Sequence, residues 1–295
     1  MGDYVISCCS TADLNDEYMR KREINYISFH YFMDDVEYLD DMGKSFSTDE
    51  FYQKMQEGAD TRTSQVNADE YAAYFEEFLK DGKDILHLTV SSGISGTINS
   101  ANIAKEELAE KYPDRKIYVI DSLCISGGFG LLMDNLADLR DEGKSIEELV
   151  DYAMSNRLRV HHWFFSTDLT FYIKGGRISK TSGFVGGILN ICPLLNVDSQ
   201  GRLVPKFKIR TMKKAILTTV EQMILYAQSH ENYSGKCFIN YSYNRNIAEE
   251  LGKLIEEKFP NLKNKIFYNS VGTTIGSHTG PGTVALFFMG DMRVD

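Results

Sequence analysis

The chain has 295 residues, with 32 Lys and Arg against 42 Asp and Glu, giving a formal net charge of −10. This acidic balance disfavours nucleic acid or an anionic membrane surface as the main partner. No apolar segment approaches the ~20 residues of a membrane-spanning helix, and no signal peptide is expected at the N-terminus. Five cysteines without a C-x-x-C pair favour a reducing, cytoplasmic location, with the adjacent Cys8 and Cys9 buried.

The first half of the chain alternates short apolar strands with helices. The strands are predicted at 4–9, 26–32, 85–90 and 116–121. The helices are predicted at 13–21 (capped by Ser10 or Thr11), 48–56, 68–80, 98–111 and 125–143. Residues 34–44 and 61–67 are predicted as loops. This alternation predicts a parallel sheet with helices on both faces, and a ligand site beyond the carboxyl ends of the strands.

From residue 160 the pattern changes to hairpins mixed with helices. Strands are predicted at 160–166, 237–241, 266–269 and 284–288, a hairpin turn at 198–201, helices at 212–229 and 244–258, and a loop at 275–283. This mixture is typical of an α+β domain. We therefore predict an N-terminal α/β domain over 1–159 and a C-terminal mixed α+β domain over 160–295.

The stretch 91-SSGISGT-97 joins a predicted strand to a predicted helix. Its two glycines permit a tight turn, and Ser95 and Thr97 suit the first turn of the helix. Free N–H groups and the helix dipole attract anions at such a place. The stretch is either an anion-binding loop or an ordinary turn, because it does not match the common nucleotide-binding loops.

Two further segments of the second half permit two interpretations. The basic turn holding Lys174, Arg177 and Lys180 is either a solvated loop or a contact for an anionic group. The apolar run 184–197, with Phe164 and Phe165, either lines a tunnel for a hydrocarbon chain or belongs to the core. The adjacent His161 and His162 point to opposite faces of a strand and carry no predicted function.

Six motifs together resemble the DegV family of bacterial fatty-acid-binding proteins. They occur in family order over almost the whole chain: 63-TSQ-65, 91-SSGISGT-97, 120-IDS-122, 169-LTFYIKGGRIS-179, 189-LNICPLL-195 and 276-GSHTGPG-282. The resemblance implies two α/β domains with one long-chain fatty acid, such as palmitate, stearate or oleate, held between them. It also implies that the chain is the fatty-acid-binding subunit that serves a separate fatty acid kinase. We expect no cofactor and no metal besides the bound fatty acid.

The resemblance also implies which residues hold the carboxylate. Thr63 and Ser95 match the family's carboxylate-binding residues, and His278 matches a histidine close to them. The full set of expected ligand-binding residues is Thr63, Ser64, Ser92, Ser95, Gly96, Thr97, Arg177, His278 and Thr279. Two positions depart from the family pattern, because Cys9 stands for the usual Asp and Cys192 for the usual Lys.

Two enzyme hypotheses compete with the binding hypothesis. In a serine hydrolase acting on acyl esters, Ser95 would be the nucleophile and His278 the base. The sequence lacks the G-x-S-x-G turn of such enzymes, and no acidic partner for His278 is evident. A nucleotide-using phosphotransferase is the other hypothesis, but no stretch matches a nucleotide loop or a metal-binding carboxylate cluster.

Overall fold

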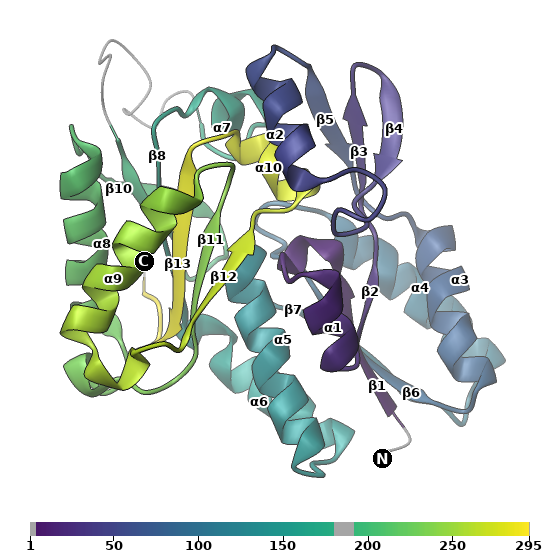
Figure 1. The fold of residues 1–295 in the computed structure, drawn as a ribbon. Helices are drawn as coiled ribbons and strands as arrows, with labels where there is room; N and C mark the ends of the chain where they lie inside the picture. Colours follow the sequence, from purple (N-terminus) through teal and green to yellow (C-terminus); the bar gives the residue numbers. More distant parts are fainter. Residues whose placement is uncertain (1–3, 180–191, 295) are drawn as a thin grey trace.

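The computed structural model describes residues 4–179 and 192–294. It contains two main sheets that lie side by side, with one long helix between them (Figure 1). The first sheet has the order β2-β1-β6-β7 and is parallel throughout. Its strands are β1 (Tyr4–Cys9), β2 (Ile24–Ile27), β6 (Asp84–Thr89) and β7 (Ile117–Asp121). The predicted parallel sheet is therefore confirmed.

Helices cover both faces of this first sheet (Figure 1). On one face lie α3 (Ala68–Lys80) and α4 (Thr97–Lys111). On the other lie α1 (Asp16–Lys21), α5 (Ser126–Asp141) and α6 (Ile146–Asn156). The predicted start of the first helix at residue 13 is wrong. Residues Ser10–Ala12 form the 3₁₀ helix η1, the left-handed Asp13 ends it, and Asn15 caps α1 by accepting from Tyr18 N at 2.8 Å.

A small antiparallel sheet, of order β4-β3-β5, stands beside the first sheet. It consists of β3 (His30–Met33), β4 (Val36–Leu39) and β5 (Thr61–Ser64), with α2 (Thr48–Gln56) next to it. Three predictions are wrong here. The expected strand 26–32 is two strands of different sheets. The expected loop at 34–44 contains β4, and the first part of the expected loop at 61–67 is β5. Pairing with β3 makes Thr61–Ser64 a strand, although it lacks the apolar alternation typical of one.

The second main sheet is mixed, with the order β10-β9-β8-β13-β11-β12. Its strands are β8 (Val160–Ser166), β9 (Leu194–Val197), β10 (Leu203–Phe207), β11 (Cys237–Tyr241), β12 (Ile266–Ser270) and β13 (Thr283–Met289). Helices α8 (Met212–Tyr226) and α9 (Arg245–Lys258) pack on its outer face (Figure 1). The predicted hairpin through 198–201 is confirmed by the antiparallel pairing of β9 with β10.

Short helices complete this half. They are α7 (Thr170–Lys174), α10 (Thr273–Thr279), η2 (Arg157–Arg159), η3 (His230–Asn232) and η4 (Pro260–Leu262). The predicted loop at 275–283 is wrong for its first part, which belongs to α10. Asp40 Oδ2 accepts from Thr274 N at 3.4 Å near the start of α10, and Tyr52 bonds to the carbonyl of Val271 at 2.9 Å. These contacts from distant parts of the chain hold a helix that its own sequence favours weakly.

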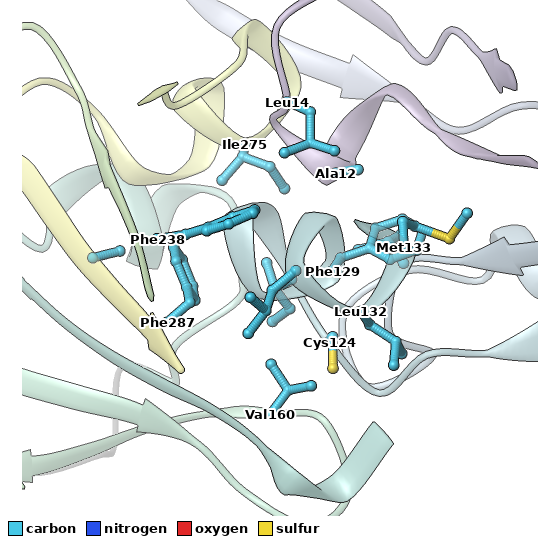
Figure 2. Packing of buried hydrophobic residues seen from close by; sticks show 14 of the residues in the cluster. Ala12, Leu14, Cys124, Phe129, Leu132, Met133, Val160, Phe238, Ile275 and Phe287 are labelled. Atoms are coloured by element: carbon cyan, nitrogen blue, oxygen red, sulfur yellow. The ribbon is translucent and has the colours of Figure 1, made fainter. Parts of the chain in front are cut away.

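Helix α5 packs against β1 on one side and against β8, β11 and β13 on the other. Figure 2 shows Phe129, Leu132 and Met133 of α5 in one cluster with Phe238 and Phe287 of the second sheet. The glycines at the start of α5 permit this close approach. A Cβ atom on Gly128 would lie only 2.6 Å from His162 Cδ2. Helix α5 packs against both sheets, so the boundary between two domains at residues 159 and 160 stays a prediction.

Candidate functional site

A cavity of about 420 Å³ lies between the two main sheets. Its wall combines η1, the end of β6, the start of α5, strands β8 and β13, and helix α10. Such a volume is typical of sites that bind small organic molecules. The cavity lies beyond the carboxyl ends of β1 and β6, where the parallel sheet predicted a ligand site.

One part of the wall is polar and is built from four separate segments. Thr63 and Ser64 come from β5, Ser95 and Gly96 precede α4, and Arg177 follows α7, while His278 and Thr279 end α10. All seven are among the predicted ligand-binding residues. Residues that lie more than 200 positions apart in the sequence are thus brought to one place.

Hydrogen bonds join these segments directly. Thr63 Oγ1 and His278 Nε2 lie 2.7 Å apart, which ties β5 to α10. Ser95 Oγ donates to Gln65 Oε1 at 3.4 Å, which connects the loop before α4 to the end of β5. Gln65 lines the cavity as well, although it was not among the predicted ligand-binding residues. Its place in the T-S-Q motif is the signal that identifies it.

Burial favours the neutral imidazole form of His278 at neutral pH. Burial, and secondarily the charge of Arg177, lowers the pKa of His278 from 6.5 to about 3. Its Nδ1 atom has no hydrogen-bond partner among the described residues. Arg177 is itself partly buried, which lowers its pKa, and its Nη1 donates to the carbonyl of Gly175 at 2.5 Å. The polar part of the wall therefore offers neutral donors together with one guanidinium cation.

The rest of the wall is predominantly apolar. Its apolar residues are Phe29, Val90, Ile94, Ile125, Phe164, Tyr172, Val197, Leu203, Val271, Ile275, Ala285 and Phe287; His162 and the hydroxyl residues Thr11, Ser126, Thr274 and Thr283 lie among them. Phe164 therefore lines the cavity as predicted, whereas Phe165 is fully buried and is not among the lining residues. Leu194 and Leu195 are buried away from the wall, and the predicted tunnel residues 184–191 lie outside the described residues.

Two predicted ligand-binding residues, Ser92 and Thr97, do not line the cavity. Ser92 is exposed, and its N–H donates to Asp121 Oδ1 at 3.1 Å, which turns this part of the loop toward β7. Thr97 is buried, and its Oγ1 bonds to the hydroxyl of Tyr71 at 2.9 Å. Tyr71 in turn contacts Cys9 Sγ at 3.3 Å, so Cys9 belongs to this buried network beside the site.

The residues of the basic turn also differ in whether they line the cavity. Arg177 lines the cavity, while Lys174 forms an ion pair with Asp60 at the surface. Lys180 lies outside the described residues. His162 was expected to have no role in a site, yet it lines the cavity. Its Nε2 accepts from the N–H of Ile125 at 3.1 Å, and burial lowers its pKa well below the usual value.

The geometry does not assemble a hydrolase triad. His278 Nε2 is engaged by Thr63, and no hydrogen bond joins Ser95 to His278 within residues 4–179 and 192–294. Within the same ranges no three acidic, His or Cys side chains are grouped as metal ligands, and no helix is both long and apolar enough to cross a membrane.

Known proteins resemble the chain over nearly its whole length. The sequence profile described as "Uncharacterised protein, DegV family" matches residues 6–291. A DegV domain-containing protein of Clostridium perfringens is 37% identical over 293 residues, which cover 99% of both chains.

Two solved structures have the same fold. The stearic acid-binding protein of Eubacterium ventriosum has a TM-score of 0.86 and 25% identity, covering 97% of this chain and 98% of that one. The fatty acid kinase (Fak) B3 protein of Streptococcus pneumoniae, solved with linoleic acid, has a TM-score of 0.83 and 25% identity over 98% and 99% of the two chains. The match of the family profile from residue 6 to residue 291 shows that the chain belongs to the DegV family.

Proposed function

We propose that this protein binds one long-chain fatty acid in the cavity, with the carboxylate at the polar part of the wall and the tail along the apolar part. The observation that carries the proposal is the division of a single 420 Å³ cavity into these two parts. Two structural relatives are described with stearic and linoleic acid, which supports the same ligand class here. Palmitate, stearate and oleate are the expected ligands.

The polar residues fit a carboxylate. Thr63 and Ser95 offer hydroxyls that can rotate to donate to a carboxylate, Ser95 in place of its 3.4 Å bond to Gln65, and Arg177 offers a positive charge. The N-terminus of α4, which has 15 residues, adds a dipole that favours an anion beside Gly96. His278 holds Thr63 in place and can donate in one of its two neutral tautomers.

The tail supplies most of the affinity. Burial of each CH₂ group contributes about 0.8 kcal/mol, so a tail of a dozen or more groups contributes on the order of 10 kcal/mol. A hydrogen bond to the carboxylate contributes about 1.5–3 kcal/mol. The tail therefore sets how tightly the acid binds, and the polar residues set which way it points.

We further propose that the chain is not itself an enzyme but presents the carboxylate to a separate fatty acid kinase, which forms the acyl phosphate. The name of the Streptococcus pneumoniae relative supports this role for that protein, and family membership extends the hypothesis to this chain. The proposal needs no resident cofactor, and a cytoplasmic location fits a kinase that uses ATP.

Mass spectrometry of lipid extracted from the purified protein tests the binding step. We expect about one fatty acid per chain, and neither extracted lipid nor binding of added acid would overturn the proposal. The second step is tested by ATP-dependent acyl phosphate formation with and without the kinase. Acyl phosphate formed by this chain alone, or turnover of a chromogenic acyl ester, would contradict the accessory role.

A further inference from the structure

The wall of the cavity contains hydroxyl groups away from the predicted carboxylate site. Thr11 lines the cavity, is only 1% exposed, and its Oγ1 has no hydrogen-bond partner among the described residues. Ser126 also lines the cavity. Its Oγ donates to Asp13 Oδ2 at 2.5 Å, so the lone pairs of Oγ remain able to accept.

These two hydroxyls lie in the same part of the wall. Thr11 belongs to η1, which packs against α5, and a Cβ atom on Gly130 would meet the carbonyl oxygen of Ala12 at 2.6 Å. Ser126 precedes Gly130 by four residues, which is about one turn of the same helix. The close contact between η1 and α5 therefore brings Thr11 and the start of α5 together.

The start of α10 belongs to the same region. Asp40 Oδ2 accepts from Ser10 Oγ at 3.2 Å and from Thr274 N at 3.4 Å, so η1 and α10 meet at one carboxylate. Thr274 lines the cavity four residues before His278. Thr274 is thus displaced by about one helical turn, ~5.4 Å along α10, from His278 at the site predicted for the carboxylate.

A plain hydrocarbon tail would leave the hydroxyl of Thr11 without a partner. A buried hydroxyl that lacks a hydrogen bond destabilises the complex, whereas Val has nearly the same shape and carries no such cost. Thr11, whose hydroxyl lacks a partner among the described residues, is therefore suited to a ligand that carries a hydrogen-bonding group at this point of the cavity.

Building on the proposed fatty-acid function, we propose that the preferred ligand is a hydroxylated long-chain fatty acid whose chain hydroxyl bonds to Thr11 and Ser126. Thr11 Oγ1 donates to the ligand hydroxyl, which donates in turn to Ser126 Oγ. A trapped water molecule has the same hydrogen-bonding chemistry, and the experiment is arranged to separate the two sources.

The test compares delipidated protein binding stearate with a series of monohydroxystearates that differ in the position of the hydroxyl. We expect at least one isomer to bind about 3- to 10-fold tighter than stearate, the effect of one net hydrogen bond. Thr11→Val should abolish this preference. Because Thr11 Oγ1 has no partner among the described residues, the variant should fold, and its melting temperature is measured alongside.

Thr89→Val is the matched control. Thr89 is fully buried, and its Oγ1 also lacks a partner among the described residues, but it does not line the cavity. It should leave the ratio of the two affinities unchanged.

Three outcomes would overturn the inference. One is that stearate binds at least as tightly as every isomer in the wild type, a comparison that needs no variant. Another is that the preference survives Thr11→Val. The third is that Thr11→Val strengthens the binding of stearate and of hydroxystearate equally. That result would mean that the hydroxyl of Thr11 bonds to a water molecule and not to the ligand. Stearate binding without any hydroxyl preference would leave the fatty-acid function standing, whereas the absence of all binding would overturn both proposals.

Discussion

The α5 side of the cavity and its polar part are held together by different kinds of contact. On the α5 side, a helix of 16 residues packs against strands of both sheets. Glycines at its start allow the helix backbone to lie in direct contact with side chains of the second sheet. The polar part depends on β5, with four residues, and α10, with seven. Two side-chain hydrogen bonds join these two elements: Thr63 Oγ1 and His278 Nε2 lie 2.7 Å apart, and Thr61 Oγ1 donates to the carbonyl of Ser277 at 3.5 Å.

This difference separates stability from ligand recognition. Dense packing around α5 makes substitutions there costly to folding, because neither sheet can move away. Around Thr63 and Ser95 the elements are short and partly exposed, so substitutions should change ligand contacts more than the free energy of unfolding. The following experiments test this separation, beginning with the largest expected effect.

Gly128→Val should destabilise the protein by about 3 kcal/mol or more, since the new side chain overlaps His162 in a packed interface. The measurement is the free energy of unfolding in urea. Gly143→Ala is the control, because no atom lies within 4 Å of its added Cβ and only the strain of its φ of 83° remains. If the two variants lost equal stability, close packing at the start of α5 would not be the main source of the effect.

Thr63→Ala and Ser95→Ala should each weaken fatty-acid binding by at most about 1–3 kcal/mol, the range for a hydrogen bond to a charged group. Neither should lower the free energy of unfolding by a comparable amount. Binding is measured by displacement of a fluorescent fatty acid. Ser92→Ala provides a control from the same loop, because Ser92 is exposed and does not line the cavity. If Ser92→Ala weakened binding as much as Ser95→Ala, the assignment of Ser95 would fail.

The pH dependence of stability should come partly from a histidine that does not line the cavity. Burial lowers the pKa of His87 from 6.5 to about 3. As the pH falls, His87 takes up a proton in the unfolded chain before it does so in the folded protein. The neutral His87 therefore contributes its full share of the unfolding free energy above pH 6.5, and this share is lost between pH 6.5 and about 3.

The expected slope from His87 is about 1.4 kcal/mol per pH unit within that interval. His87→Gln should flatten the curve of unfolding free energy against pH without changing fatty-acid affinity at neutral pH. A slope identical to that of the wild type would contradict this origin. His161, His162 and His278 are also buried with lowered pKa values, so they add slopes of the same sign.

His278→Ala should affect presentation of the carboxylate more than binding. Because the tail dominates affinity, we expect the dissociation constant to change by about 3-fold or less. Kinase turnover per bound lipid should fall by about 10-fold, equivalent to one misplaced hydrogen bond. The exposed His230 in η3 provides the control substitution His230→Ala. Collapse of lipid binding with normal turnover per bound lipid would mean that His278 has been given the wrong role.

The regular parts of this fold could be predicted from the sequence because local signals are strong there. The limits of α2 and α3 match the prediction, and Ser47 and Asn67 each form a capping box at their starts. By contrast, β5 and α10 depend on distant partners. The residues Thr61–Ser64 become a strand only beside β3, and α10 contains glycine and β-branched residues that favour a helix weakly.

The candidate site shows the same limit. Thr63, Ser95 and His278 could be identified through their motifs, and the structure brings all three to the cavity. Thr11, His162 and Phe29 line the cavity too, yet nothing in their local sequence distinguishes them from ordinary buried residues. Their position follows from how η1, β8 and the small sheet pack around α5. The local sequence pattern does not specify this tertiary packing.

The placement of α5 has a consequence for how the molecule unfolds. Its residues on both sides are buried, so neither sheet can lose its partner without exposing an apolar face of this helix. Local unfolding of one half therefore also raises the free energy of the other half, and the two sheets should unfold as one cooperative unit. In calorimetry the van't Hoff enthalpy should equal the calorimetric enthalpy, and a fragment ending at residue 159 should aggregate through the uncovered side of α5.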